Sequence, residues 1–273
     1  MYGYPGGVLR MTGNERFFGL RPQNDSILTD SSGCALRMTR KNDREGQKMN
    51  FGAVIAAAGM SKRMKDFKQL MKIEDMTFTE RVIANYRDSG IREIVVVTGY
   101  RGDELEKSLK DSGAVFIRNE EYENTHMFDS ALLGLSYLRE RCDAVFFSPV
   151  DVPSFTEDTI SALADSAEKA DVIVPWCQGR PGHPLLLSKK AVEYMLSYDG
   201  QGGLRGAYEK IRASGYGSVL DLPVEDDGSI MDADTKEDYE NLLKYNKIRQ
   251  SDPLASGGDW LKKSNINGDF GNE

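Results

Sequence analysis

Short apolar segments alternate with longer amphipathic segments along the centre of this chain, and this alternation restricts the fold more than any other feature. The predicted strands, rich in Val, Ile or Phe, are 54–57, 93–98, 114–118, 144–148, 172–175 and 218–222. The predicted helices are 79–88, 102–111, 128–140, 157–168, 189–196, 204–213 and 236–244. Alternation of this kind predicts an α/β fold, with a mostly parallel sheet covered by helices on both faces in a three-layer α/β/α Rossmann-like arrangement.

The two ends of the chain differ in composition from this centre. Residues 1–49 and 249–273 are rich in Gly, Asn, Asp and Ser and show no sustained helical or strand period, which is typical of segments without a packed core. Met49 directly precedes the first predicted strand. We therefore expect a disordered N-terminal extension over 1–49, one folded domain over 50–248 and a flexible tail over 249–273.

Charge and composition exclude several classes of protein. The 43 acidic residues outnumber the 35 basic ones, for a formal net charge of -8, which argues against nucleic acid or an anionic membrane surface as a partner. The chain has no apolar run of the roughly 18 residues that a spanning helix needs, and its start lacks the apolar core of a signal peptide. Its three cysteines and two histidines predict neither a disulfide framework nor a histidine-rich zinc site. We expect a cytoplasmic protein.

The loop after the first predicted strand combines small residues with spaced cations. Its candidate nucleotide-binding residues are Ala57, Ala58, Gly59 and Ser61. Small side chains let a ligand approach backbone N–H groups, which form a concave anion site in such turns. Arg63 and Lys68 add a guanidinium fork and a point charge that suit a triphosphate. The loop lacks the Walker and dinucleotide glycine patterns, so a different nucleotide-binding fold is expected.

Two acidic sites are candidates for metal binding, one just after a predicted strand and one just before the last predicted helix. Asp151 follows the strand 144–148 between two prolines, and a rigid carboxylate there suits Mg²⁺, which takes one or two protein carboxylates together with waters and substrate phosphates. Asp232 and Asp234 precede the last predicted helix, where Asp234 or Thr235 also suits the N-cap. A carboxylate not used for capping can join Asp151 at a metal.

Three further segments lie where ligands bind in open α/β sheets, beyond the carboxyl ends of the strands. Arg180 and His183 occupy a tight Gly/Pro loop that would hold a side chain over an acceptor. The glycine-rich turn 199–205 is either an anion-binding helix entry or a flexible one. Asn119 and Ser130 are candidates for contacts to a base or ribose, and Ser130 is equally explained as a helix cap.

Taken in order, these pieces resemble the molybdenum cofactor cytidylyltransferase family, within the nucleotidyltransferases that share a glycosyltransferase-A-like Rossmann arrangement, over about residues 51–245. The matching motif residues are Ala57, Ala58, Gly59, Ser61, Arg63, Met64, Lys68, Asp151, Pro153, Gly182, His183, Pro184, Asp232, Asp234 and Thr235. The chain departs from the family at Lys65, where a glycine is usual, and in the turn 199–205, which bears on the acceptor.

The resemblance implies transfer of CMP from CTP to a molybdopterin-type molybdenum cofactor with release of pyrophosphate. Mg²⁺ would lie on Asp151 and Asp234, Arg63 and Lys68 would neutralise the pyrophosphate, and a molybdenum hydroxylase or its accessory protein would receive the product. Ala58, where guanylyltransferase relatives carry glycine, favours CTP over GTP. The alternatives are GTP as donor, a sugar or polyol phosphate as acceptor, and a non-catalytic molybdenum cofactor chaperone.

Overall fold

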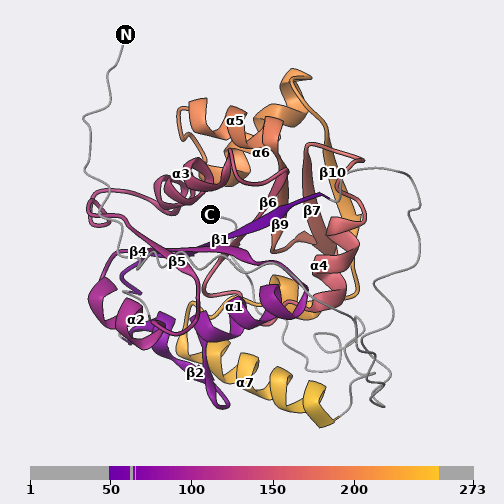
Figure 1. The fold of residues 1–273 in the computed structure, drawn as a ribbon. Coiled ribbons are helices and arrows are strands. Elements are labelled where there is room, and N and C mark those ends of the chain that lie inside the picture. Colours follow the sequence, from indigo (N-terminus) through magenta and orange to yellow (C-terminus); the bar gives the residue numbers. More distant parts are fainter. Residues whose placement is uncertain (1–48, 62–63, 65, 252–273) are drawn as a thin grey trace, which may run out of the picture.

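The computed structural model describes residues 49–61, 64 and 66–251, which form one large sheet flanked by helices (Figure 1). The strands on its main path are β10 (Val219–Pro223), β7 (Val172–Cys177), β9 (Leu185–Ser188), β6 (Ala144–Pro149), β1 (Phe51–Ala57), β4 (Glu93–Thr98) and β5 (Val115–Arg118), in this spatial order. The short β8 (Arg180–Pro181) pairs with β7. β9 is antiparallel to both its neighbours, and every other pair on the path is parallel.

Helices cover both faces of the sheet (Figure 1). The helices on one face are α3 (Met127–Leu138), α5 (Lys189–Ser197) and α6 (Gly203–Ser214). Those on the other are α1 (Phe78–Asp88), α2 (Gly102–Ser108), α4 (Glu157–Ala164) and α7 (Lys236–Ser251). Successive side chains of β1 enter opposite cores, with Ile55 in one and Val54 in the other, as the two-residue period of a strand requires. The predicted three-layer α/β/α fold is confirmed.

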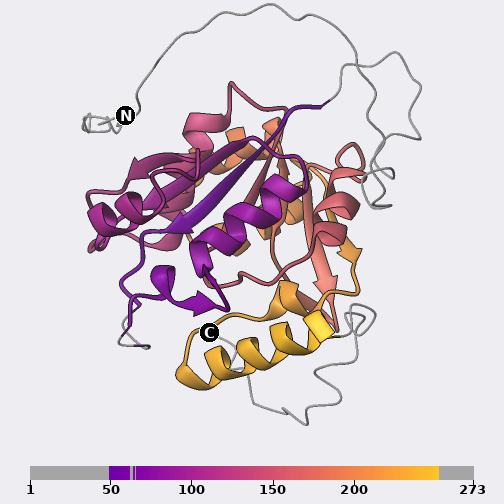
Figure 2. The same ribbon diagram turned by 60° about the horizontal axis from the view of Figure 1, so that its bottom comes forward.

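Short strands account for most of the differences from the predicted elements. β9 is a four-residue apolar segment that enters between β6 and β7, and periodicity alone cannot separate such a segment from an apolar loop. The hairpin of β2 (Lys72–Ile73) and β3 (Met76–Thr77) is shorter still. It lies beside α7 (Figure 2), where the Tyr239 hydroxyl donates to the Lys72 carbonyl at 2.7 Å.

The predicted end of the last helix is wrong, because α7 continues to Ser251 and the expected boundary between residues 248 and 249 falls inside it. Its final turns are polar in sequence but are held by tertiary contacts. The Asn246 amide donates to the Ser154 hydroxyl at 2.8 Å, and Arg249 donates to the Ser154 carbonyl at 3.1 Å. The expected extensions 1–48 and 252–273 lie outside the described residues. Among the helices that the structure describes, none is long and apolar enough to cross a membrane.

Candidate active site

The loops that follow β1 and β6 meet at the carboxyl edge of the sheet. The two strands are parallel neighbours with Ala56 opposite Pro149, and the Val150 amide donates to the Ala56 carbonyl at 3.0 Å. Asp151 therefore emerges beside the loop that begins after Ala57. This is the edge at which open parallel sheets bind ligands.

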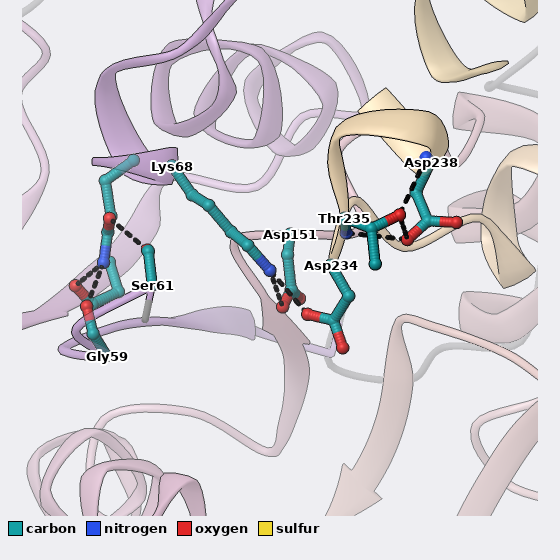
Figure 3. Close-up of polar contacts among 9 residues, drawn as sticks. Gly59, Ser61, Lys68, Asp151, Asp234, Thr235 and Asp238 are labelled. Carbon is teal, nitrogen blue, oxygen red and sulfur yellow. Dashed lines mark hydrogen bonds and ion pairs between the residues drawn. The ribbon is translucent and has the colours of Figure 1, made fainter. Parts of the chain in front are cut away.

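Lys68 and two carboxylates form a compact cluster at this edge (Figure 3). The Lys68 ammonium lies 2.5 Å from Asp234 Oδ1 and 3.7 Å from Asp151 Oδ2. The lysine is buried, whereas the side chains of Asp151 and Asp234 are 29% and 25% exposed. Burial raises the pKa of Asp151, the Lys68 charge lowers it and the Asp234 charge raises it. The structure thus brings together Lys68, Asp151 and Asp234, which the sequence places far apart.

The approach of Asp234 to this cluster depends on how α7 is capped. Thr235 Oγ1 accepts from the Asp238 amide at 3.2 Å, and Asp238 Oδ2 accepts from the Thr235 amide at 2.7 Å, a reciprocal cap of the helix start. The Ala233 amide donates to the Asp151 carbonyl at 3.0 Å and fixes the preceding segment. Thr235 is therefore the cap, and Asp234 points toward Lys68 and Asp151 (Figure 3).

The cluster has the donor set of a two-carboxylate metal site. Mg²⁺ is commonly held by one or two carboxylates, with waters and substrate phosphates completing its octahedron. Asp151 and Asp234 both present oxygens to one cationic atom, the Lys68 nitrogen. Within the described part of the chain, no group of three or more His, Cys, Asp or Glu side chains is arranged so that it could hold a metal ion by itself. The residues present fit a metal that is shared with a substrate better than a metal enclosed by protein.

Gln69 was missed in the sequence and turns out to hold the loop after β1. It lies on the 3-10 turn η1 (Lys68–Leu70) with 1% of its surface exposed. Its amide nitrogen donates to the carbonyls of Ala57 at 3.0 Å and Gly59 at 2.7 Å, and its oxygen accepts from Ser61 Oγ at 3.4 Å. These partners are mainly backbone groups, which no side-chain motif reveals. Arg63, the other predicted cation, lies outside the described residues.

The small residues of the loop have different surroundings. Ala58 is buried, its carbonyl accepts from the Tyr100 amide at 3.1 Å, and a Cβ added at Gly99 would lie 2.9 Å from the Ala58 Cβ. Gly59 instead borders open space, since a Cβ there would meet nothing within 4 Å among the described neighbours. Ala58 therefore packs against the next loop of the sheet, and Gly59 leaves room beside the backbone.

Asn119 and Ser130, predicted to contact the nucleotide, are buried and bonded to each other. The Asn119 amide nitrogen donates to Ser130 Oγ at 3.0 Å and to Thr125 Oγ1 at 2.8 Å, and its oxygen accepts from the Glu121 amide at 3.1 Å. Asp129 accepts from the His126 amide at 2.7 Å and so caps α3. Both amide hydrogens of Asn119 are thus used to shape this loop, and a nucleotide contact by either residue stays a prediction.

A cavity of about 630 Å³ lies on the sheet face covered by α3 and α6. It is lined by His126 and the start of α3, by Phe147 of β6, and by residues 181–185 apart from Pro184. The turn 199–205 that leads into α6, apart from Gln201, and Tyr208 of α6 complete the lining. The first N–H groups of α6 have no partner within the helix and, with Arg205, suit an anionic group. β6 thus borders the cavity through Phe147 and leads two residues beyond its end to Asp151.

His183 and Arg180, the predicted acceptor residues, have different positions. His183 lines the cavity and its ring lies 6.1 Å from that of Phe147. Burial lowers the pKa of His183 to about 4, and its Nδ1 is buried without a hydrogen-bond partner in the described structure. Arg180 lies on β8 opposite Cys177 and is absent from the described cavity lining, which includes Arg205 instead. At neutral pH the histidine therefore offers the cavity an uncharged ring.

Comparisons with known proteins give a family match and solved structures of similar fold. The MobA-like NTP transferase domain family matches residues 53–214. The molybdenum cofactor cytidylyltransferase of Escherichia coli strain K12 is 29% identical over 187 residues, which cover 68% of this chain and 92% of that protein. A Methanothermobacter nucleotidyl transferase has a TM-score of 0.63 at 21% identity and covers 73% of this chain and 98% of its own. A Mycobacterium tuberculosis protein in complex with manganese has a TM-score of 0.56 at 20% identity, with coverages of 72% and 99%.

Proposed function

Since this chain belongs to the MobA-like NTP transferase domain family and is a nucleotidyltransferase, we propose that it transfers CMP from CTP to a molybdopterin-type molybdenum cofactor. The observation that carries the proposal is the placement of Lys68, Asp151 and Asp234 around one point beside the loop after β1. The choice of CTP and of this acceptor is supported by the 29% identity to the Escherichia coli cytidylyltransferase.

The reaction needs little covalent chemistry from the protein. The terminal phosphate oxygen of the acceptor attacks the α-phosphorus of CTP, the bond from that phosphorus to the bridging oxygen breaks, and pyrophosphate leaves with the electron pair. An acceptor phosphate monoester is already anionic, so the step needs no general base. Catalysis then rests on positioning and on stabilising negative charge.

The residues divide this work between them. Asp151 and Asp234 would hold a divalent metal, Mg²⁺ in our proposal, which supplies charge neutralisation at the phosphates. The solved relative of similar fold that contains manganese is consistent with this assignment. Lys68 would bind the phosphates of the leaving group, as would Arg63, while Gln69 keeps the backbone of the loop in place. Because α6 begins at the cavity and Arg205 lines it, the Arg205 guanidinium and the N–H groups at the start of α6 would bind the acceptor anion.

Pyrophosphate release tests this proposal directly. Purified protein would be incubated with CTP, GTP, ATP or UTP and Mg²⁺, with and without molybdopterin-type cofactor. We expect release only with CTP and only when the cofactor is present. Pyrophosphate release that depends on a sugar or polyol phosphate would reassign the acceptor. Release with GTP would reassign the nucleotide donor. Transfer of the product to a molybdenum hydroxylase would be examined once CTP- and cofactor-dependent release is observed.

A further inference from the structure

Lys68 occupies the position that the proposed metal would need. Its nitrogen is 2.5 Å from Asp234 Oδ1 and 3.7 Å from Asp151 Oδ2. A metal ion bound to that Asp234 oxygen, at about 2.1 Å, would lie within about 4.6 Å of the ammonium. A divalent and a monovalent cation that close repel each other strongly unless anions lie between them. The lysine and the metal therefore compete for the same carboxylates.

The surroundings of Lys68 hold it in this position when no ligand is present. The residue is 6% exposed, so its ammonium has lost most of its water and needs a charged partner. The carboxylates are its partners in the described structure. Its neighbour on the same 3-10 turn, Gln69, is bonded to the backbone of the loop after β1, so the backbone that carries Lys68 is fixed while its long side chain can turn.

We propose that Lys68 occupies the metal position between Asp151 and Asp234 when no nucleotide is bound, so that the metal enters together with the nucleoside triphosphate. The phosphates offer Lys68 a second set of anionic partners and the metal its remaining ligands. Lys68 then moves from the carboxylates to the phosphates as the metal replaces it. This inference rests on the proposed nucleotidyltransferase function, and it adds an order of binding to it.

Mn²⁺ binding to the nucleotide-free full chain tests the inference without any catalytic readout. Free Mn²⁺ would be measured by electron paramagnetic resonance during titration of the wild type, of Lys68→Met and of Lys68→Gln, with circular dichroism to verify folding. We expect weak binding by the wild type and an increase in affinity of at least about tenfold in the variants, since a neighbouring positive charge is removed. If only one of the two variants folds, its Mn²⁺ affinity alone decides the test. Unchanged or weaker binding would overturn the proposal.

Two controls locate the effect. Lys72→Met removes an exposed lysine four positions along the chain and should leave Mn²⁺ affinity unchanged. Adding Asp234→Asn to Lys68→Met should abolish the gain, because one of the two carboxylates is lost. A gain that survives Asp234→Asn, or one that appears in Lys72→Met, would place the bound Mn²⁺ elsewhere and contradict the proposal.

The wild type supplies an independent test that needs no folded variant. Mn²⁺ alone should leave its thermal unfolding temperature unchanged, whereas Mn²⁺ with CTP should raise it, as ligands specific for the native state do. Micromolar Mn²⁺ binding by the nucleotide-free wild type would overturn the inference even if the enzyme releases pyrophosphate. Tighter Mn²⁺ binding by Lys68→Met, without pyrophosphate release from any triphosphate, would instead count against the proposed function alone.

Discussion

The carboxylate cluster of Lys68, Asp151 and Asp234 and the cavity between α3 and α6 differ in how far their polar groups are already satisfied. In the cluster, the ammonium and both carboxylates pair with each other. In the cavity of about 630 Å³, which Arg205 of α6 also lines, His183 Nδ1 is buried without a partner in the described structure. To bind a ligand, the charged groups of the cluster must exchange their present ion-pair partners. The buried nitrogen of His183 in the cavity would instead gain a hydrogen-bond partner.

This difference separates two kinds of chemistry at one sheet edge. A charged cluster whose ammonium and carboxylates pair with one another suits the part of a reaction common to many nucleotidyltransferases, namely metal and triphosphate binding. A cavity with an uncharged histidine and a glycine-rich helix entry suits recognition of one acceptor. Substitutions in the cluster should therefore reduce the rate with every acceptor, and substitutions in the cavity should act on acceptor binding.

The largest effect is expected at Asp151. Asp151→Asn keeps the size of the side chain but removes the charge that would hold the metal, and loss of one such electrostatic contact typically costs roughly 3 to 4 kcal/mol, or about 10²- to 10³-fold in kcat. Steady-state pyrophosphate release would measure it. The control is Asp143→Asn, an exposed carboxylate just before the amino end of the same strand, which should keep full activity. Near-normal turnover of Asp151→Asn would disprove the metal assignment.

A smaller effect, confined to the acceptor, is expected at Arg205. Arg205→Ala removes a cation that lines the cavity at the start of α6, and because the side chain is exposed we expect about a tenfold rise in the KM for the acceptor, with the KM for CTP unchanged. Arg212 on the same helix instead pairs with Asp221 at 2.8 Å, so Arg212→Ala should leave the KM for the acceptor and the KM for CTP unchanged. An equal rise in both KM values for Arg205→Ala would remove the distinction between the two regions.

Much of the fold and part of the site follow from the sequence. Buried parallel strands such as β4 are apolar throughout, so their pattern is plain, and the order of the parallel strands places Asp151 beside the loop after β1. Three features could not be predicted. β9 has only four residues, too few to show a strand period. The role of Gln69 depends on carbonyls whose direction is set only after folding, and the pairing of Lys68 with the carboxylates depends on tertiary placement.

The pH dependence of stability tests the uncharged state of the cavity histidine. The pKa of His183 is lowered to about 4 in the folded protein, while an unfolded histidine has a pKa of about 6.5. Between these values the unfolded chain binds more protons, so this contribution to stability is fully present above the unfolded pKa and is lost as the pH falls toward 4. We expect a loss of about 2 kcal/mol between about pH 7 and pH 5.

Comparison with His183→Asn isolates this contribution, because other titrating groups are common to both proteins. The free energy of unfolding, measured with urea, should fall more steeply with acid in the wild type than in His183→Asn. His126, the other histidine of the chain, is exposed, and His126→Asn should follow the wild type. Parallel curves for the wild type and His183→Asn would mean that folding leaves the pKa of His183 unchanged, and would contradict the expected effect of burial.

The smallest effect on the reaction is expected at Gln69, which supports the loop beside the carboxylate cluster without touching a ligand. Gln69→Met keeps the volume but leaves the carbonyls of Ala57 and Gly59 without its amide, and an unmet buried hydrogen bond costs about 1 to 3 kcal/mol. We expect lower thermal stability and a KM for CTP raised about fivefold, with the KM for the acceptor unchanged. Gln69→Glu would bury a carboxyl group against the same two carbonyl oxygens and should lose more stability than Gln69→Met. A Gln69 variant that loses stability but has an unchanged KM for CTP would show that Gln69 contributes to stability alone. The loop after β1 would then adopt its binding conformation without the Gln69 side chain.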